Sequence, residues 1–196
     1  MERTDRPTPE DVAAADGLTI PDVVADGLLV LFVGINPGRY SGATGHHFAR
    51  PGNRFWKALH RAGFTDRVWS PDEDRDLPSV GLGVTNLVAR TTRAAAELDR
   101  AELRAGAGRV ERLASVHRPT VVAVLGIGAF RTAFDRPRAV LGAQPEHLGP
   151  ALLWVLPNPS GLNAHHQLDD LGRRFRELRD AAVAARRSAS TGPGGS

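Results

Sequence analysis

The sequence predicts an α/β fold, specifically a three-layer α/β/α sandwich around a short, mainly parallel sheet. Three apolar runs carry this prediction, at residues 28–33, 120–125 and 152–156, and each is followed closely by a glycine or a proline. Continuous apolar runs of this length are typical of strands that are buried on both faces. Segments with helical spacing separate the runs, and this alternation indicates a sheet covered by helices on both sides.

Three segments are predicted to be helical, at residues 51–62, 99–118 and 167–184. The first begins with a proline and ends before Gly63, as helices commonly do. The second opens with Asp99-Arg100-Ala101-Glu102, the pattern of a capping box. The third carries an apolar stripe, so we expect it to cover the sheet. The acidic residues 72–76 are predicted to form a solvated loop.

The chain is long enough for one domain, which we place at residues 27–185. Residues 1–26 hold seven acidic and two basic side chains (net −5), whereas residues 27–196 hold 15 acidic and 23 basic ones (net +8). We expect residues 1–26 to form a loosely ordered acidic segment and residues 186–196 a flexible C-terminal tail. The basic main part suits a polyanionic partner such as a nucleic acid.

Composition excludes several classes of protein. The chain has no cysteine, which excludes disulfides, thiolate zinc sites, cysteine nucleophiles and cysteine-ligated iron–sulfur clusters. No apolar run approaches the ~18 residues that a membrane span needs, and the first residues do not resemble a secretory signal. We therefore expect a cytoplasmic protein without a membrane partner.

A glycine-bounded turn, Gly34-Ile35-Asn36-Pro37-Gly38, directly follows the first predicted strand. Glycine lets a ligand approach the backbone closely, and proline stiffens the turn. Two interpretations of Asn36 remain open. Its side chain either faces a ligand at the edge of the sheet or bonds its own backbone, as asparagine often does in turns.

Phe48 lies twelve residues after Asn36 in a polar loop. An aromatic ring in such a loop either stacks on a base or belongs to the core. His46 and His47 are adjacent in the sequence, so their rings tend to point apart, which disfavours a metal pair.

A proline-stiffened loop follows the last predicted strand, with the sequence Pro157-Asn158-Pro159-Ser160-Gly161-Leu162. An apolar residue at the tip of such a loop can wedge into a base stack. The alternative is that Leu162 packs as a hydrophobic staple on the following helix.

Four motifs at characteristic spacings give the chain its resemblance to a known family. They are Gly34-Ile35-Asn36-Pro37-Gly38, Pro51-Gly52-Asn53-Arg54-Phe55-Trp56-Lys57, Gly83-Val84-Thr85-Asn86-Leu87-Val88 and Asn158-Pro159-Ser160-Gly161-Leu162. Together they resemble the mismatch-specific uracil- and thymine-DNA glycosylase family, over about residues 28–180. The resemblance implies the uracil-DNA glycosylase fold, with DNA crossing the face where the strands end.

The same resemblance implies an activity. The protein would be a monofunctional glycosylase that flips uracil, or a related base such as ethenocytosine or thymine, out of a G-mismatched duplex. It would hydrolyse the glycosidic bond and leave an abasic site, in base excision repair. The implied partner is double-stranded DNA with a mismatched or damaged base, and the implied enzyme is a monomer that needs neither a cofactor nor a metal.

The resemblance also implies roles for individual residues. Asn36 would position the attacking water, Phe48 would stack on the flipped base, and Gly34 and Ile35 would wall the pocket. Ser41 falls where the family places a residue near the 5-position of the base. Asn86 belongs to the pocket, but it stands where bacterial members commonly have a lysine.

Gly161, Leu162 and Asn163 fall on the intercalation loop of the family, which fills the space left by the flipped nucleotide. Asn158 and Ser160 would brace this loop or hold a phosphate. Ala164 stands where bacterial members have an arginine. Together with Asn86, this departure leaves the preferred base open among uracil, ethenocytosine, thymine, xanthine and hypoxanthine.

Two chemical arguments refine the expected activity. Asparagine is a poor general base, so we expect slow turnover. The only lysine, Lys57, lies on a predicted helix, and without an amine nucleophile no lyase step is expected. Two other functions remain open: a non-catalytic module of the same fold that binds damaged DNA, and a hydrolase of free nucleosides or nucleotides.

Overall fold

The structure is a computed structural model that describes residues 6–163 and 165–190. Ala164 and residues 191–196 of the predicted tail lie outside the described residues. The chain forms one five-stranded sheet, built from β1 (Val30–Gly34), β2 (Leu82–Asn86), β3 (Val121–Leu125), β4 (Gly142–Leu148) and β5 (Ala151–Leu156).

The strand order is β2-β1-β3-β5-β4, and every neighbouring pair is parallel except β5 with β4. The three apolar runs became β1, β3 and β5, as predicted. The sequence did not predict β2 or β4. β2 combines glycine, threonine and asparagine with only two large apolar residues, and β4 is an edge strand whose residues are largely open to solvent.

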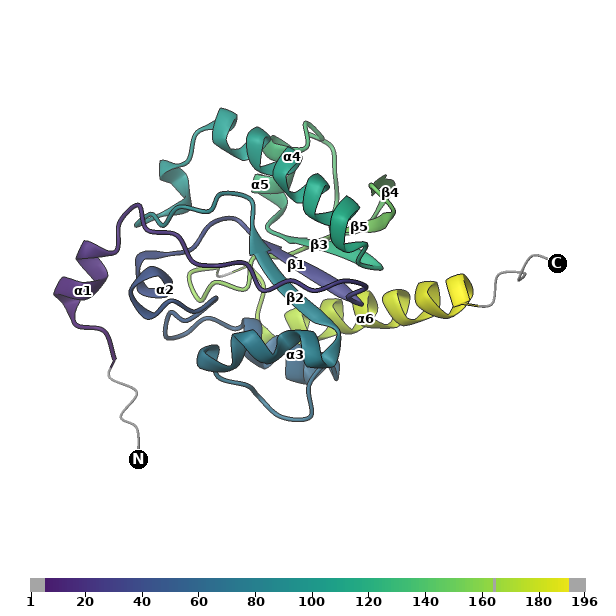
Figure 1. Cartoon of the computed structure of the whole chain (residues 1–196), viewed down its shortest axis with the longest axis horizontal. Helices are drawn as coiled ribbons and strands as arrows, with labels where there is room; N and C mark the ends of the chain where they lie inside the picture. The colour runs from purple at the N-terminus through teal and green to yellow at the C-terminus, as the bar shows by residue number, and fades with distance from the viewer. Residues whose placement is uncertain (1–5, 164, 191–196) are drawn as a thin grey trace.

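Helices cover both faces of the sheet (Figure 1). On one face lie α3 (Phe55–Ala62) and α6 (Leu168–Ser190), and on the other lie α4 (Arg100–His117) and α5 (Ile127–Ala133). Alternate residues of β1 point into the two resulting cores, with Phe32 in one and Val33 in the other. The predicted three-layer α/β/α sandwich is therefore confirmed.

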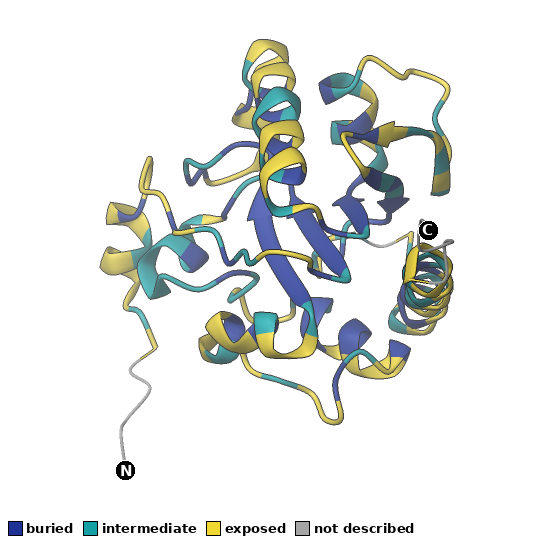
Figure 2. Ribbon diagram, turned by 45° about the vertical axis from the view of Figure 1, so that its right-hand side comes forward, coloured by how far each residue is buried: buried dark blue, intermediate teal, exposed yellow. Residues whose placement is uncertain are grey.

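An aromatic cluster fills the core between the sheet and the first helical face. Phe32 stacks on Phe175 at 5.6 Å between ring centroids and meets Phe55 edge-on at 5.3 Å. All three rings are fully buried. Figure 2 shows β1, β2 and β3 as buried along their whole length, whereas β4 at the edge is partly exposed. This packing fixes α3 against the sheet, and with it the loop that leads into α3.

The predicted helices formed with shifted ends. The capping box of α4 is present, since Asp99 accepts a hydrogen bond from the Glu102 backbone at 2.8 Å and Glu102 returns one. The first predicted helix begins at Phe55 rather than at residue 51, because residues 51–54 form a turn. The last helix continues to Ser190, through part of the predicted tail. A short helix that was not predicted, α2 (Arg39–Thr44), follows β1.

The N-terminal region is more ordered than its composition predicts. After α1 (Pro9–Ala14), residues 15–23, which we call the N-terminal strap, run alongside the segment 84–92. Ala15, Ile20 and Val23 of the strap are buried, and backbone hydrogen bonds join Val23 to Val84 at 2.8 and 2.9 Å. Buried apolar side chains and backbone hydrogen bonds together hold this segment against the domain.

The acidic residues 72–76 do not form a solvated loop, so this prediction was wrong. They lie in the 3₁₀ helix η1 (Pro71–Val80), and Asp74 is only 1% exposed. Its carboxylate accepts a hydrogen bond from the His47 backbone at 2.8 Å and lies 3.0 Å from Nδ1 of His46. Burial of this charge is tolerated because both carboxylate oxygens have partners.

Within the described residues, no helix is long and apolar enough to cross a membrane.

Candidate active site

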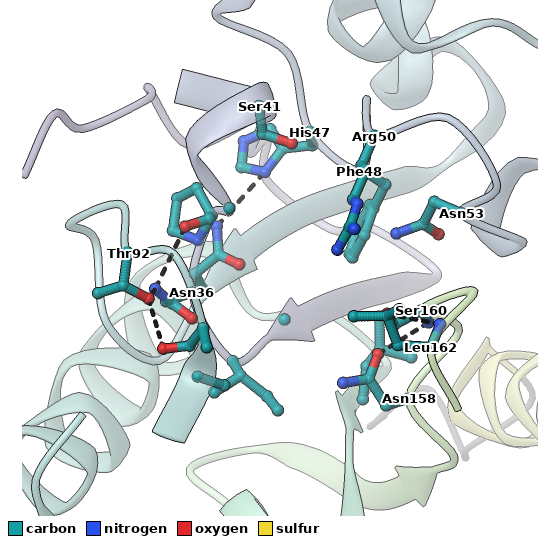
Figure 3. A pocket seen from close by; sticks show the side chains of 18 of the residues that line it. Asn36, Ser41, His47, Phe48, Arg50, Asn53, Thr92, Asn158, Ser160 and Leu162 are labelled. Atoms are coloured by element: carbon teal, nitrogen blue, oxygen red, sulfur yellow. Dashed lines mark hydrogen bonds between the residues drawn. The ribbon is translucent and has the colours of Figure 1, made fainter. Parts of the chain in front are cut away.

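A cavity of about 440 Å³ opens where the loops after β1, β2 and β5 meet (Figure 3). Parallel strands end at the same edge of a sheet, which is where ligands gather in folds of this type. Ten of the eleven residues predicted to form a site line the cavity: Gly34, Ile35, Asn36, Ser41, Phe48, Asn86, Asn158, Ser160, Leu162 and Asn163. Gly161 lies in an adjoining hollow. The lining residues include no carboxylate.

The Asn36 amide is held in one orientation. Its Nδ2 lies 2.8 Å from Oγ1 of Thr92, 3.1 Å from the Arg90 carbonyl and 3.2 Å from the Pro37 carbonyl. Carbonyls only accept hydrogen bonds, and the Thr92 hydroxyl donates its own hydrogen to Ala94. Oδ1 of Asn36 is left without a partner among the described residues, so it is the atom that Asn36 offers to the cavity.

Phe48 is neither free nor fully part of the core. Its ring stacks on Phe55 with centroids 4.1 Å apart and planes 25° apart, while the half-buried side chain also lines the cavity. The backbone of Phe48 adopts a left-handed conformation with φ of 53°, which non-glycine residues rarely adopt. Such strain persists only where the surroundings impose it, and here it directs an aromatic ring toward the cavity.

Ser41 and Ile35 also line the cavity. Ser41 is buried, and its Oγ accepts a hydrogen bond from the Ala49 backbone at 3.2 Å, which braces the loop that carries Phe48. Ile35 is half-buried and packs with the core on the α4 and α5 side of the sheet. Both side chains therefore shape the cavity, and Ser41 also supports its aromatic face.

Asn86 ends β2 and is almost fully buried at the bottom of the cavity. Its Nδ2 lies 3.4 Å from Nδ1 of His47, whose Nε2 lies 2.9 Å from the Pro21 carbonyl. Gly34 is required beside it, because a Cβ at this position would collide with Oδ1 of Asn86. Burial lowers the pKa of His47 below its ordinary value, so the imidazole is neutral near pH 7.

The loop at residues 157–163 is braced by its own side chains. Oδ1 of Asn158 accepts a hydrogen bond from the Ser160 backbone at 2.9 Å, and Nδ2 of Asn163 donates to the Asn158 carbonyl at 2.9 Å. Leu162 at the tip is 75% exposed, which excludes the staple interpretation in this structure. A large apolar side chain is thereby presented to solvent beside the cavity.

Arg54, the residue before α3, clamps this loop. Its guanidinium donates to the carbonyls of Ser160 at 2.6 Å, Asn163 at 2.7 Å and His166 at 2.5 Å. The chains approach so closely that a Cβ at Gly161 would lie 2.6 Å from the Gly52 carbonyl oxygen. The motifs at residues 51–54 and 158–162 are therefore packed directly against each other.

Sequence reasoning did not single out Thr92, Arg54, Ile20 or the role of His47. Arg54 stood inside a quoted motif, but nothing in the sequence indicates that its partners are carbonyls more than 100 residues away. His46 and His47 contact Asp74 and Pro21 respectively, so their imidazoles have different partners.

The described residues contain no group of three or more side chains suited to hold a metal ion.

Two arginines line the cavity, Arg50 from the loop before α3 and Arg93 from the loop after β2. Both are exposed, and neither makes an ion pair or a side-chain hydrogen bond with the described residues. The cavity therefore has two arginines without an ion-pair partner among its lining residues, and none of the lining residues is a carboxylate. This arrangement suits a ligand with phosphate groups.

The clamp yields a prediction about stability. Replacing Arg54 with alanine removes three hydrogen bonds to loop carbonyls, so we expect a loss of about 1–3 kcal/mol in unfolding free energy. Hydrogen exchange at the Asn163 amide, which bonds the Ser160 carbonyl, should accelerate. Arg61→Ala, which removes an exposed ion pair with Asp169, is the matched control and should change stability by less than about 0.5 kcal/mol. Equal exchange rates in the two variants would contradict the clamp.

Comparison with known protein families places the chain. Residues 21–183 match the model of the uracil DNA glycosylase superfamily. The match includes all five strands and every lining residue of the cavity except Ile20. It implies a hydrolase that releases bases from DNA, and hence a function in DNA repair. The chain belongs to the uracil DNA glycosylase superfamily.

Proposed function

We propose that this protein is a monofunctional DNA glycosylase that flips uracil, and related bases such as ethenocytosine or thymine, out of G-mismatched duplex DNA. It hydrolyses the glycosidic bond and leaves an abasic site for base excision repair. The observation that carries the proposal is the fixed Asn36 amide, whose unpartnered Oδ1 belongs to the same cavity as the Phe48 ring.

The cavity fits a single flipped base. One face of Phe48 is covered by Phe55, and stacking on the face toward the cavity offers a base about 1–3 kcal/mol. The Oδ1 atom of Asn86 supplies a hydrogen-bond acceptor at the bottom. An aromatic face combined with a fixed polar group is typical of sites that bind one small ring specifically.

The chemistry follows from the absence of a lining carboxylate. Departure of the base leaves an oxocarbenium-like sugar, which phosphates of the DNA can stabilise electrostatically. Oδ1 of Asn36 accepts a hydrogen bond from a water and orients it toward the sugar. Because an amide does not take up the proton, water attack is aided by position rather than by a general base, and turnover is slow.

Leu162, Arg50 and Arg93 bring the nucleotide to the cavity. Extruding a nucleotide costs a few kcal/mol, and the cost is smallest at a mismatch. Leu162, exposed at the tip of a braced loop, fills the vacated space in the stack. Arg50 and Arg93 bind phosphates beside the extruded nucleotide, where their charge is unopposed.

The reaction ends at the abasic site. A lyase step needs an amine that attacks the sugar, and the only lysine of the chain, Lys57, is exposed on α3 and does not line the cavity. We further propose that the enzyme acts as a cytoplasmic monomer, associated with the nucleoid in a bacterium.

The first test of this proposal is base release. A duplex with one G·U pair should be cleaved at the uracil by alkali after incubation with the protein, because the abasic site is alkali-labile. The set should include G·T, ethenocytosine, xanthine and hypoxanthine duplexes. Failure on all of them would leave the non-catalytic damage-binding module, and release from free nucleosides without a duplex would favour a nucleoside hydrolase.

Asn36→Ala should reduce base release by at least about 100-fold, since the attacking water loses its orientation. Binding to an abasic-site duplex should change little. Thr92→Val is a graded control, because it removes one of three acceptors around the Asn36 amide and should cost less. Single-turnover rates check both variants, and full activity in Asn36→Ala would mean that the water is held elsewhere.

Leu162→Ala should slow uracil release from a G·U duplex by about tenfold while leaving release from single-stranded DNA almost unchanged, since only the duplex requires a wedge. Val116→Ala is the matched control, because Val116 on α4 is also exposed, at 68%. Equal losses on duplex and single strand would argue against a wedge.

Arg50→Gln and Arg93→Gln should each lower the slope of log K against log salt for abasic-site DNA by about 1, the value for one lost phosphate contact. Arg112→Gln removes an exposed arginine that does not line the cavity, and should leave the slope unchanged. Fluorescence anisotropy at several salt concentrations measures this. An unchanged slope in both cavity variants would show that the phosphates lie elsewhere.

A further inference from the structure

The N-terminal strap borders the loop after β2, which bonds the Asn36 amide. We propose that the strap is a positioning element of the active site, which acts through Thr91 to hold residues 90–92 where they orient Asn36. The inference rests on the proposed function and adds to it a segment outside the matched region. Residues 15–20 of the strap precede the family match, which begins at residue 21.

Residues 90–92 contact the turn that carries Asn36 through two of their backbone groups. The Arg90 carbonyl accepts a hydrogen bond from the Asn36 amide at 3.1 Å, and the Thr92 N–H donates to the Pro37 carbonyl at 3.2 Å. The Thr92 hydroxyl oxygen is a further acceptor for Asn36, at 2.8 Å (Figure 3). The orientation of Asn36 therefore depends on where residues 90–92 lie.

Thr91, between these two residues, directs its polar groups to the strap. Its N–H donates to the Leu18 carbonyl at 2.7 Å, and its carbonyl accepts from the Gly17 N–H at 3.1 Å. Its hydroxyl donates to the Ala15 carbonyl. Thr91 is fully buried, so water cannot replace these partners, and losing one leaves a polar group unpaired. All three polar groups of Thr91 thus hold the segment to the strap.

The strap is also anchored to α2. A Cβ at Gly42 of this helix would lie 2.6 Å from Cγ2 of Thr91, so the helix and the threonine are in close contact. Asp16 of the strap pairs with Arg39, the first residue of α2, at 2.9 Å. Because α2 begins directly after the turn that carries Asn36, the strap is tied to both sides of the hydrogen bonds that orient this amide.

The strap acts on the reaction at a distance. Thr91 and residues 15–19 do not line the cavity, so they reach the attacking water only through Asn36. A displacement of about 1 Å at a group that orients a reactant can cost about 100-fold in rate. Loosening of the strap should therefore slow base release while leaving the binding of DNA unchanged. Thr91 is in this sense a positioning residue.

The first experiment measures hydrogen exchange at the Asn36 side-chain amide in the full-length protein, assigned by comparison with Asn36→Ala. Gly17 has φ of 73° and open space where a Cβ would lie, so Gly17→Ala strains only the backbone of the strap. Exchange at the Thr91 N–H and at the Asn36 amide should both accelerate by about fivefold or more.

Gly27→Ala is the matched control for this experiment. Gly27 has φ of 67° and the same open surroundings, but it bonds the His117 carbonyl rather than the loop after β2. Exchange at the Asn36 amide should be unchanged in this variant. Equal acceleration in the two variants, or none at Asn36 in Gly17→Ala, would overturn the inference. Neither reading depends on catalysis.

The second experiment compares single-turnover release of uracil from a G·U duplex. Thr91→Val keeps the shape of the side chain but lacks the hydroxyl, so the rate should fall about three- to tenfold, with binding to abasic-site DNA unchanged. Thr91→Ser keeps the hydroxyl and should restore most of the rate. Thr65→Val is the control, because Thr65 is also buried and donates to a carbonyl, that of Arg67 at 2.7 Å. In the Asn36→Ala background, Thr91→Val should have no further effect.

The outcomes separate this inference from the proposed function. If the wild type releases uracil but Thr91→Val keeps its rate, or loses as much in the Asn36→Ala background, the inference fails and the proposed function stands. If the wild type releases no base, the proposed function fails, and the exchange rates alone decide whether the strap holds Asn36. Should Thr91→Val not fold, the comparison of Gly17→Ala with Gly27→Ala decides the inference.

Discussion

The hydrogen bonds from the Asn36 amide to Thr92 and to the Arg90 carbonyl connect the loop after β1 to the loop after β2. The chemistry of the cavity depends on this contact, because it leaves an oxygen as the only group that Asn36 can offer. Asn86 is constrained in a similar way by His47. Two amides, each able to donate or accept in solution, are thereby reduced to two acceptors that face one small space.

The distribution of charge complements these acceptors. A carboxylate at the cavity would repel the phosphates that stabilise a developing oxocarbenium ion, whereas the exposed Arg50 and Arg93 attract them. The cost is the loss of a general base. In the proposed mechanism, the site therefore lacks a general base but accepts the phosphates of an extruded nucleotide.

The loop at residues 157–163 is made rigid by hydrogen bonds rather than by a core of its own. Asn158, Ser160 and Asn163 bond within the loop, and Arg54 ties two of its carbonyls, and that of His166 just beyond it, to the start of α3. In the proposed mechanism, little conformational entropy is therefore lost when Leu162 enters a base stack. The start of α3 supports two parts of the cavity wall, since Phe55 stacks on Phe48 and the preceding Arg54 donates hydrogen bonds to the carbonyls of Ser160 and Asn163.

The sequence by itself determined the three buried strands, the cap of α4 and the positions of Asn36 and Leu162 in loops that follow strands, with Phe48 in a separate polar loop. These follow from local patterns: apolar runs, a capping box and glycine and proline spacing. It could not determine β2 and β4, whose residues are polar or sit at an edge, nor the burial of Asp74. Only the tertiary structure decided which atom each asparagine presents, because that choice depends on acceptors such as Pro21 and Arg90. Those acceptors are backbone carbonyls, which every residue carries, so no pattern of side chains in the sequence reveals them.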